Sequence, residues 1–137
     1  MYNQRIVVRP AQSNDAEVVA KVVAMAIGDE VALQNYCGVE YLDVLAEIAR
    51  REATQYSWQY ALVAEVDGAT AGAVVGYDGA RLSELREGTF AVLRERTGYI
   101  PVVADETEAG EYYLDSVGVL PEFRGCGVVG EKVRLSL

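Results

Sequence analysis

The sequence predicts an α/β fold (α+β by the stricter naming) on three observations. Short runs rich in valine and tyrosine indicate strands, and longer segments with apolar residues at helical spacing indicate helices. The pair Asp67-Gly68, placed between two apolar runs, is typical of the tight turn of an antiparallel hairpin. We therefore expect a sheet that packs against helices.

The length and composition indicate a single domain over residues 1–137. Apolar residues make up 51% of the chain and charged residues 24%, as in an ordinary globular protein. No apolar run reaches the length of a membrane span, and Met1 is not followed by a signal region. We expect a cytoplasmic protein that does not bind membranes.

Charge and residue usage exclude several kinds of site. The chain has no histidine, and Cys37 and Cys126 lack the spacing of metal ligands, so no metal site is predicted. The net charge of -9 argues against nucleic acid as a partner, because phosphate binding needs a basic surface. The same charge suits a cationic amine substrate, although solubility alone explains it equally well.

The first predicted elements are a strand and a helix. Residues 5–10 form a β-branched run that ends at a proline, so we expect a strand near a sheet edge. Ser13, or Asn14 with Glu17 three residues later, is a helix start, and Gly28 is the expected stop. The apolar stripe of this helix consists of Val18, Val19, Val22, Val23, Ala26 and Ile27.

A second helix is predicted over residues 40–53, and a hairpin follows it. The buried side of this helix consists of Leu42, Leu45, Ile48 and Ala49. Strands are expected over residues 60–66 and 71–77, on either side of the Asp67-Gly68 turn. A third helix, over residues 81–96, carries Leu82, Leu85, Thr89, Val92 and Leu93 on one face. The acidic residues 105–111 either line an acceptor pocket or form a solvated loop.

A last strand, over residues 111–119, leads into a cluster of glycines. Pro121 ends the strand, and Gly125, Gly127 and Gly130 precede residues able to start a helix. Glycines let a backbone come close to phosphate, and the N–H groups of a helix N-terminus point at the anion. The order of residues fits neither a dinucleotide fingerprint nor a P-loop, and glycine content alone is equally compatible with a plain turn.

The residues around these glycines give a more specific indication. The string V-G-V-L-P-E-F-R-G-C-G-V resembles the acetyl-CoA-binding motif of the GCN5-related N-acetyltransferase (GNAT) family. Arg124, Gly125 and Gly127 match that motif in type and order. Val129 stands where the family usually has glycine or alanine, and Gly130 follows one position later.

The resemblance implies a GNAT-like fold, which is a mixed, mostly antiparallel sheet flanked by helices on both faces. It covers most of this chain but only about the N-terminal two-thirds to three-quarters of the family domain, so the C-terminal strand-helix-strand part is expected to be lacking. The strand over residues 111–119 would then keep an unpaired edge and the sheet a bare apolar face. Because such surfaces invite self-association, we expect a homodimer.

The resemblance also implies an acetyl-CoA-dependent N-acetyltransferase that acts on a primary amine of a small molecule or a protein. The backbone of the glycine loop would bind the pyrophosphate of acetyl-CoA, and the preceding strand would bind the pantetheine arm and the acetyl carbonyl. The residues expected at the donor are Val117, Gly118, Val119, Arg124, Gly125, Cys126, Gly127, Val128 and Val129.

The groups for proton transfer are less specific. Asp115 and Glu111, with Glu65, are general-base candidates because they lie on or beside central strands, and strand alternation places Glu111 and Asp115 on one face. Tyr36, Tyr77 and Tyr41 are candidates for the acceptor site, and in the family the loop after the first helix borders that site. The tyrosine that supplies the acid in the family has no counterpart before Leu137. The alternatives are a non-catalytic acyl-CoA-binding module and an inactive, truncated acetyltransferase that self-associates.

Overall fold

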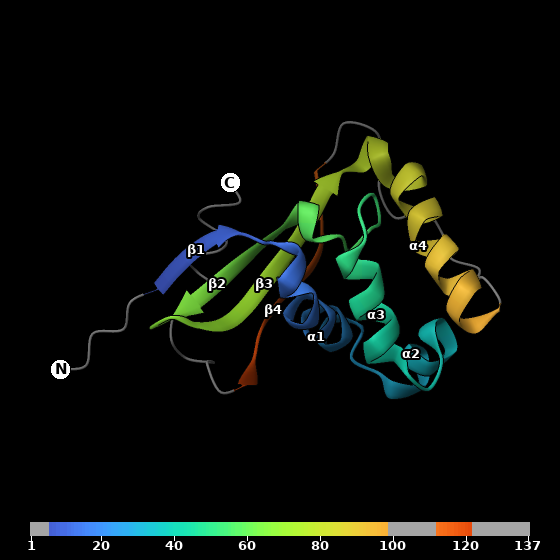
Figure 1. Ribbon diagram of the computed structural model, residues 1–137, viewed down its shortest axis with the longest axis horizontal. Coiled ribbons are helices and arrows are strands. Elements are labelled where there is room, and N and C mark those ends of the chain that lie inside the picture. Colours follow the sequence, from blue (N-terminus) through green and yellow to red (C-terminus); the bar gives the residue numbers. More distant parts are fainter. Residues whose placement is uncertain (1–5, 99–111, 122–137) are drawn as a thin grey trace.

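The structure is a computed structural model that describes residues 6–98 and 112–121, the last group as backbone only up to residue 117. These residues form an antiparallel sheet and helices beside it (Figure 1). The strands are β1 (Ile6–Pro10), β2 (Ala61–Val66), β3 (Ala69–Asp78) and β4 (Tyr112–Val119), in the order β1-β2-β3-β4. Every neighbouring pair is antiparallel. The predicted fold class, the hairpin and the outer position of the first strand are confirmed.

The described helices are α1 (Ala16–Ile27), α2 (Glu30–Cys37), α3 (Tyr41–Arg50) and α4 (Leu82–Thr97). Gly28 ends α1 at φ 81°, as expected. The prediction missed α2 because this helix has eight residues, of which only Leu33 and Cys37 are buried, so its sequence carries little helical periodicity. The second predicted helix is shorter than expected and ends at Arg50.

The main core lies between one face of the sheet and the helices. In Figure 1, α3 lies between α1 and α4, and α2 packs at one end of α3. The fully buried members of this core are Val19, Val22, Leu45, Ile48, Ala49, Val63, Ala73, Val75, Val92 and Leu93. All five residues predicted to line the buried face of the third helix are buried in α4. This face of the sheet therefore supports α1 and, through it, the other helices.

Two residues expected in this core are exposed. Leu42 is 44% exposed because the first turn of α3 opens onto a surface cavity. Ala26 lies in the last turn of α1, at the border of the apolar stripe, and is also exposed. The predicted apolar stripes of α1 and α3 are therefore correct at the centre of each helix. The prediction is wrong at the last turn of α1 and at the first turn of α3.

The opposite face of the sheet carries a second, smaller apolar cluster. Val63 and Ala64 are adjacent in β2, so their side chains point to opposite faces, and only Val63 belongs to the main core. The second cluster consists of Ala64, Val66, Ala71 and Val119, with Ile6 and Val8 packed against it. Its four central members are at most 7% exposed. The expected bare sheet face is therefore wrong for this part of the chain.

Candidate functional site

The end of β4 is the part of the predicted donor site that the structure describes. Ala73 pairs with Gly118 and Gly72 with Val119, and the Leu120 N–H then donates to the Ala71 carbonyl at 2.7 Å. Pro121 follows at the surface, where the strand was expected to stop. The predicted loop residues Arg124, Gly125, Cys126, Gly127, Val128 and Val129 lie outside the described residues, as does Glu111.

Gly118 packs closely against α1. A Cβ atom at this position would lie 3.0 Å from the Met25 Cε and 3.3 Å from the Val22 Cγ1. Val119, the next residue, is buried in the second cluster on the opposite face. Since both side-chain positions face protein atoms, any contribution of these two residues to donor binding comes from their backbone.

Asp115 lies at an irregularity of β4. Val75 pairs with Ser116 and Gly76 with Leu114, so Asp115 is the extra residue of a β-bulge. Bulges interrupt the alternation of side chains and re-aim them, and they are frequent beside active sites. The shared face expected for Asp115 and Glu111 stays a prediction, because Glu111 lies outside the described residues.

A cavity of 520 Å³ opens beside the end of β4. It lies where the C-terminal half of α1, the helix α2 and the first turn of α3 meet the residues that follow β4. Its lining consists of Lys21, Ala24, Met25, Gly28, Leu33, Tyr41, Leu42, Leu120 and Pro121. Most of these residues are apolar, and Lys21 is the charged one among the lining residues that the structure describes. The volume is that of a small-molecule site, so this cavity is the candidate site.

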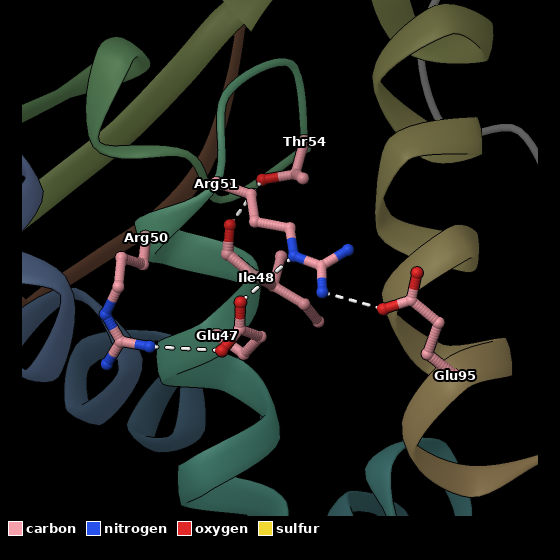
Figure 2. Close-up of polar contacts among 6 residues, drawn as sticks. All are labelled: Glu47, Ile48, Arg50, Arg51, Thr54 and Glu95. Carbon is pink, nitrogen blue, oxygen red and sulfur yellow. Dashed lines mark hydrogen bonds and ion pairs between the residues drawn. The ribbon is translucent and has the colours of Figure 1, made fainter.

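A charged groove of 350 Å³ continues from the cavity, and Lys21 and Leu42 line both. Its other lining residues are Glu17, Ala20, Asp43, Ala46, Glu47, Arg50 and Arg96. The Glu47 carboxylate forms ion pairs with Arg50 at 3.1 Å and with Arg51 at 3.0 Å (Figure 2). Arg51 also reaches Glu95 of α4 at 2.7 Å. The groove is thus a surface where charges of both signs meet.

The predicted acceptor tyrosines do not all converge on this cavity. Tyr41 lines it. The hydroxyl of Tyr36 lies 3.4 Å from that of Tyr56, outside the lining. Tyr77 is 2% exposed and accepts a hydrogen bond from the Gln55 Nε2 at 3.4 Å, in a separate cluster with Leu82 and Leu85. A substrate role for Tyr36 and Tyr77 stays a prediction.

The side chains of Glu65 and Cys37 are chemically reactive groups that lie outside the cavity lining. Glu65 forms an ion pair with Arg9 at 3.3 Å and does not line the cavity. Cys37 is buried, and burial raises the pKa of its thiol to about 12, so this thiol stays protonated at neutral pH. Neither group is placed to act on a ligand in the cavity.

The sequence did not single out the lining residues Lys21, Ala24, Met25 and Leu33. Lys21 lies with Glu17 on the face of the first helix opposite the apolar stripe, where a charged residue is the ordinary expectation, so its sequence position carried no signal. The contribution of Leu33 could not be found, because it depends on the helix α2 that the sequence did not reveal.

Two solved structures share this architecture. One, described as the crystal structure of an acetyltransferase, is 25% identical over 95% of this chain and 71% of its own, with a TM-score of 0.79. The other, an N-acetyltransferase from Staphylococcus aureus Mu50, is 20% identical over 96% of this chain and 74% of its own, also with a TM-score of 0.79. The chain has an acetyltransferase fold. No protein-family model matches the chain, and the curated proteins contain no match.

The acetyltransferase fold confirms the GNAT-like architecture that the glycine-loop motif implied. This chain covers 71% and 74% of the two solved chains. These values agree with the expectation that the resemblance extends over about two-thirds to three-quarters of the family domain. In residues 6–98 and 112–121, none of the helices is both long and apolar enough to span a membrane.

Proposed function

We propose that the chain is an acetyl-CoA-dependent N-acetyltransferase that acts on the primary amine of a small molecule or of a protein. The observation that carries this proposal is the fold, shared over 95% of the chain with an acetyltransferase at a TM-score of 0.79. A second observation supports it: β4 ends beside a cavity and leads directly into the R-G-C-G sequence.

Acetyl-CoA would bind along the end of β4 and at the loop after it. The backbone N–H groups over residues 124–129 would hold the pyrophosphate, because the amides of a glycine loop and helix start favour anions. The backbone of residues 117–119 would hold the pantetheine arm and the thioester carbonyl. The side-chain positions of Gly118 and Val119 are occupied by packing, which is compatible with this backbone role.

The reaction joins the acceptor nitrogen to the acetyl carbonyl carbon and releases coenzyme A. A base takes a proton from the amine, and the departing thiolate is reprotonated. Asp115 is the base that we propose, because it is the extra residue of a β-bulge, and bulges are frequent beside active sites. Glu111 stays the second candidate.

A specific observation favours the alternative of a non-catalytic acyl-CoA-binding module. Among the residues that the structure describes, the cavity lining contains no carboxylate, and Glu65 is paired with Arg9. If Asp115 and Glu111 do not reach the acceptor, the protein binds acetyl-CoA without transferring the acetyl group.

Titration of the 137-residue protein with acetyl-CoA in a calorimeter tests the proposal first. We expect one site per chain, and a panel of primary amines should then give acetylated product. Asp115→Asn should lower the turnover number by about 10²- to 10⁴-fold and leave acetyl-CoA affinity unchanged. Glu65→Gln is the matched control and should retain turnover.

The outcomes separate the alternatives. Binding without any acetylated product would establish the non-catalytic module. No binding by protein that circular dichroism shows to be folded would exclude both functions. A homodimer and a cytoplasmic location stay part of the proposal.

A further inference from the structure

We propose that the cavity beside β4 selects an amine that carries both an apolar group and a carboxylate, which is the chemistry of a free apolar amino acid. The inference rests on the proposed function, since it names the acceptor class of that same site. It depends on two features of the lining, which are its apolar walls and the position of Lys21.

The walls of the cavity favour an apolar group on the acceptor. Met25 from α1, Leu33 from α2 and Leu42 from α3 face the cavity together with Leu120. Leu42 is 44% exposed, which is unusual for a large apolar residue in a helix that otherwise buries its leucine and isoleucine. A ligand that covers Leu42 would remove this apolar surface from water, which is favourable. The volume of 520 Å³ is sufficient for a leucine or phenylalanine side chain.

Lys21 favours a carboxylate on the same molecule. It is the charged residue of the cavity lining, and within residues 6–98 and 112–121 it forms no ion pair with a protein carboxylate. Lys21 is exposed, so water partly screens its attraction for an anion, and its pairing with a ligand carboxylate depends on a charge-assisted hydrogen bond formed while the ligand's apolar group covers the cavity walls. A carboxylate of the ligand would therefore find its partner here.

The presence of Lys21 also disfavours polyamines as acceptors in this cavity. A second ammonium group on the acceptor would lie near Lys21 and would meet apolar walls that cannot solvate it. The net charge of -9 suggests a cationic substrate for the molecule as a whole, but the lining of this cavity has the opposite sign. Glu17 and Asp43 line the neighbouring groove with Lys21 and could attract the ligand's ammonium group if the ligand bound there instead.

The test compares three amines by calorimetry, each with and without coenzyme A. L-Phenylalanine carries the apolar group and the carboxylate, phenethylamine lacks the carboxylate, and spermidine is a polycation. We expect L-phenylalanine to bind about tenfold more tightly than phenethylamine, since one charge-assisted contact is lost. Spermidine should bind least. Tighter binding of spermidine would overturn the proposal. So would displacement of L-phenylalanine by coenzyme A, because the cavity would then belong to the donor.

Two variants with matched controls locate the effect. Lys21→Gln should lower the affinity for L-phenylalanine to that for phenethylamine and leave phenethylamine binding unchanged. Arg94→Gln, an exposed cation of α4 outside both cavities, should change neither. Leu42→Ser should weaken both ligands roughly tenfold, whereas Val7→Ser, at a residue that is 36% exposed on β1, should not.

The binding measurements keep the two proposals apart. If acetyl-CoA binds and L-phenylalanine does not, the acceptor class is wrong and the proposed function stands. If L-phenylalanine binds with the expected preference and acetyl-CoA does not, the cavity is an amino-acid site without transferase function. Loss of the preference in the Arg94→Gln control would show that net charge, rather than Lys21, causes it.

Discussion

Arg9 joins three separate segments at the edge of the sheet. Its guanidinium donates two hydrogen bonds to Asp15, at 2.8 and 3.0 Å, and lies 3.3 Å from Glu65 of β2. Asp15 also accepts the Gln12 N–H at 2.7 Å and is 8% exposed. Asp15 therefore fixes the 3-10 turn over residues 13–15 that leads into α1, and neither Ser13 nor Asn14 is the N-cap of α1.

The pair of Arg9 and Asp15 predicts how stability depends on acid. The hydrogen bonds from Arg9, assisted by the Gln12 N–H, hold the pKa of the Asp15 carboxyl below its ordinary value of 3.8. The unfolded chain therefore binds this proton at higher pH than the folded one. The contribution of Asp15 to stability is complete above the ordinary pKa and is lost as pH falls through the lowered one.

Asp15→Asn is the corresponding test. At pH 7 we expect it to lower the free energy of unfolding by about 1–3 kcal/mol, because Arg9 loses its charged partner. The difference from the wild type, measured by urea unfolding at several pH values, should shrink below pH 4 or so, where Asp15 becomes protonated. A difference that stays constant down to pH 2 would show that Asp15 acts by packing and not by charge.

Gly88 marks the closest approach of α4 to the segment after α3. A Cβ atom at this position would overlap the Ala53 carbonyl oxygen. The same segment is fixed to α4 by the Gln55 N–H, which donates to the Thr89 Oγ1 at 3.0 Å. The glycine in the middle of this helix is therefore a packing requirement, although glycine is a poor helix former.

Gly88→Ala should consequently destabilise the protein. Alanine improves helix propensity by about 1 kcal/mol, but the overlap costs more, and we expect a net loss of about 1–2 kcal/mol. Thermal unfolding monitored by circular dichroism measures it. Ser83→Ala, at an exposed position of the same helix, is the control and should be neutral or slightly stabilising. An increase in stability for Gly88→Ala would show that α4 moves freely away from Ala53.

At the scale of elements, α4 is held by apolar packing more than by charge. Val92 and Leu93 are fully buried against the main core, whereas the ion pair between Arg51 and Glu95 joins side chains that are 38% and 56% exposed (Figure 2). Exposed ion pairs contribute little to stability because water and salt screen them.

Two substitutions in α4 compare these contributions. Leu93→Ala should lower the free energy of unfolding by about 2–5 kcal/mol, through lost burial and the cavity left behind. Glu95→Gln should shift the urea midpoint only slightly, and 1 M salt should abolish the shift. A large, salt-insensitive effect of Glu95→Gln would show that the link between α3 and α4 is the main attachment of this helix.

At the scale of the whole molecule, the predicted homodimer now depends on the strand edge. On the second sheet face, Ala64, Val66, Ala71 and Val119 are buried, and Ile6 and Val8 are half-buried. Within the described sheet, β4 is an outer strand, and outer strands are sites of association between chains. Sedimentation velocity should give a dimer at micromolar concentration. Monomer throughout a concentration series would contradict this prediction.

The local patterns of the sequence determined most of the elements. Valine-rich runs, the Asp67-Gly68 turn and the apolar face of residues 81–96 each predict an element that the structure contains. These signals work because a strand or an amphipathic helix is defined by the spacing of residues close in the chain. The glycine-loop motif likewise indicated the acetyltransferase fold, because its strand, proline and glycines are contiguous.

Only the tertiary structure decided which residues surround the cavity. Lys21, Leu33, Leu42 and Leu120 come from four segments, and none of their local patterns distinguishes a cavity wall from a core position. The same is true of Asp115, whose bulge appears only when β4 pairs with β3, and of Gly118, whose role is set by Met25 of α1. Contacts between distant segments depend on how elements pack, and a pattern within one element carries no record of its neighbour.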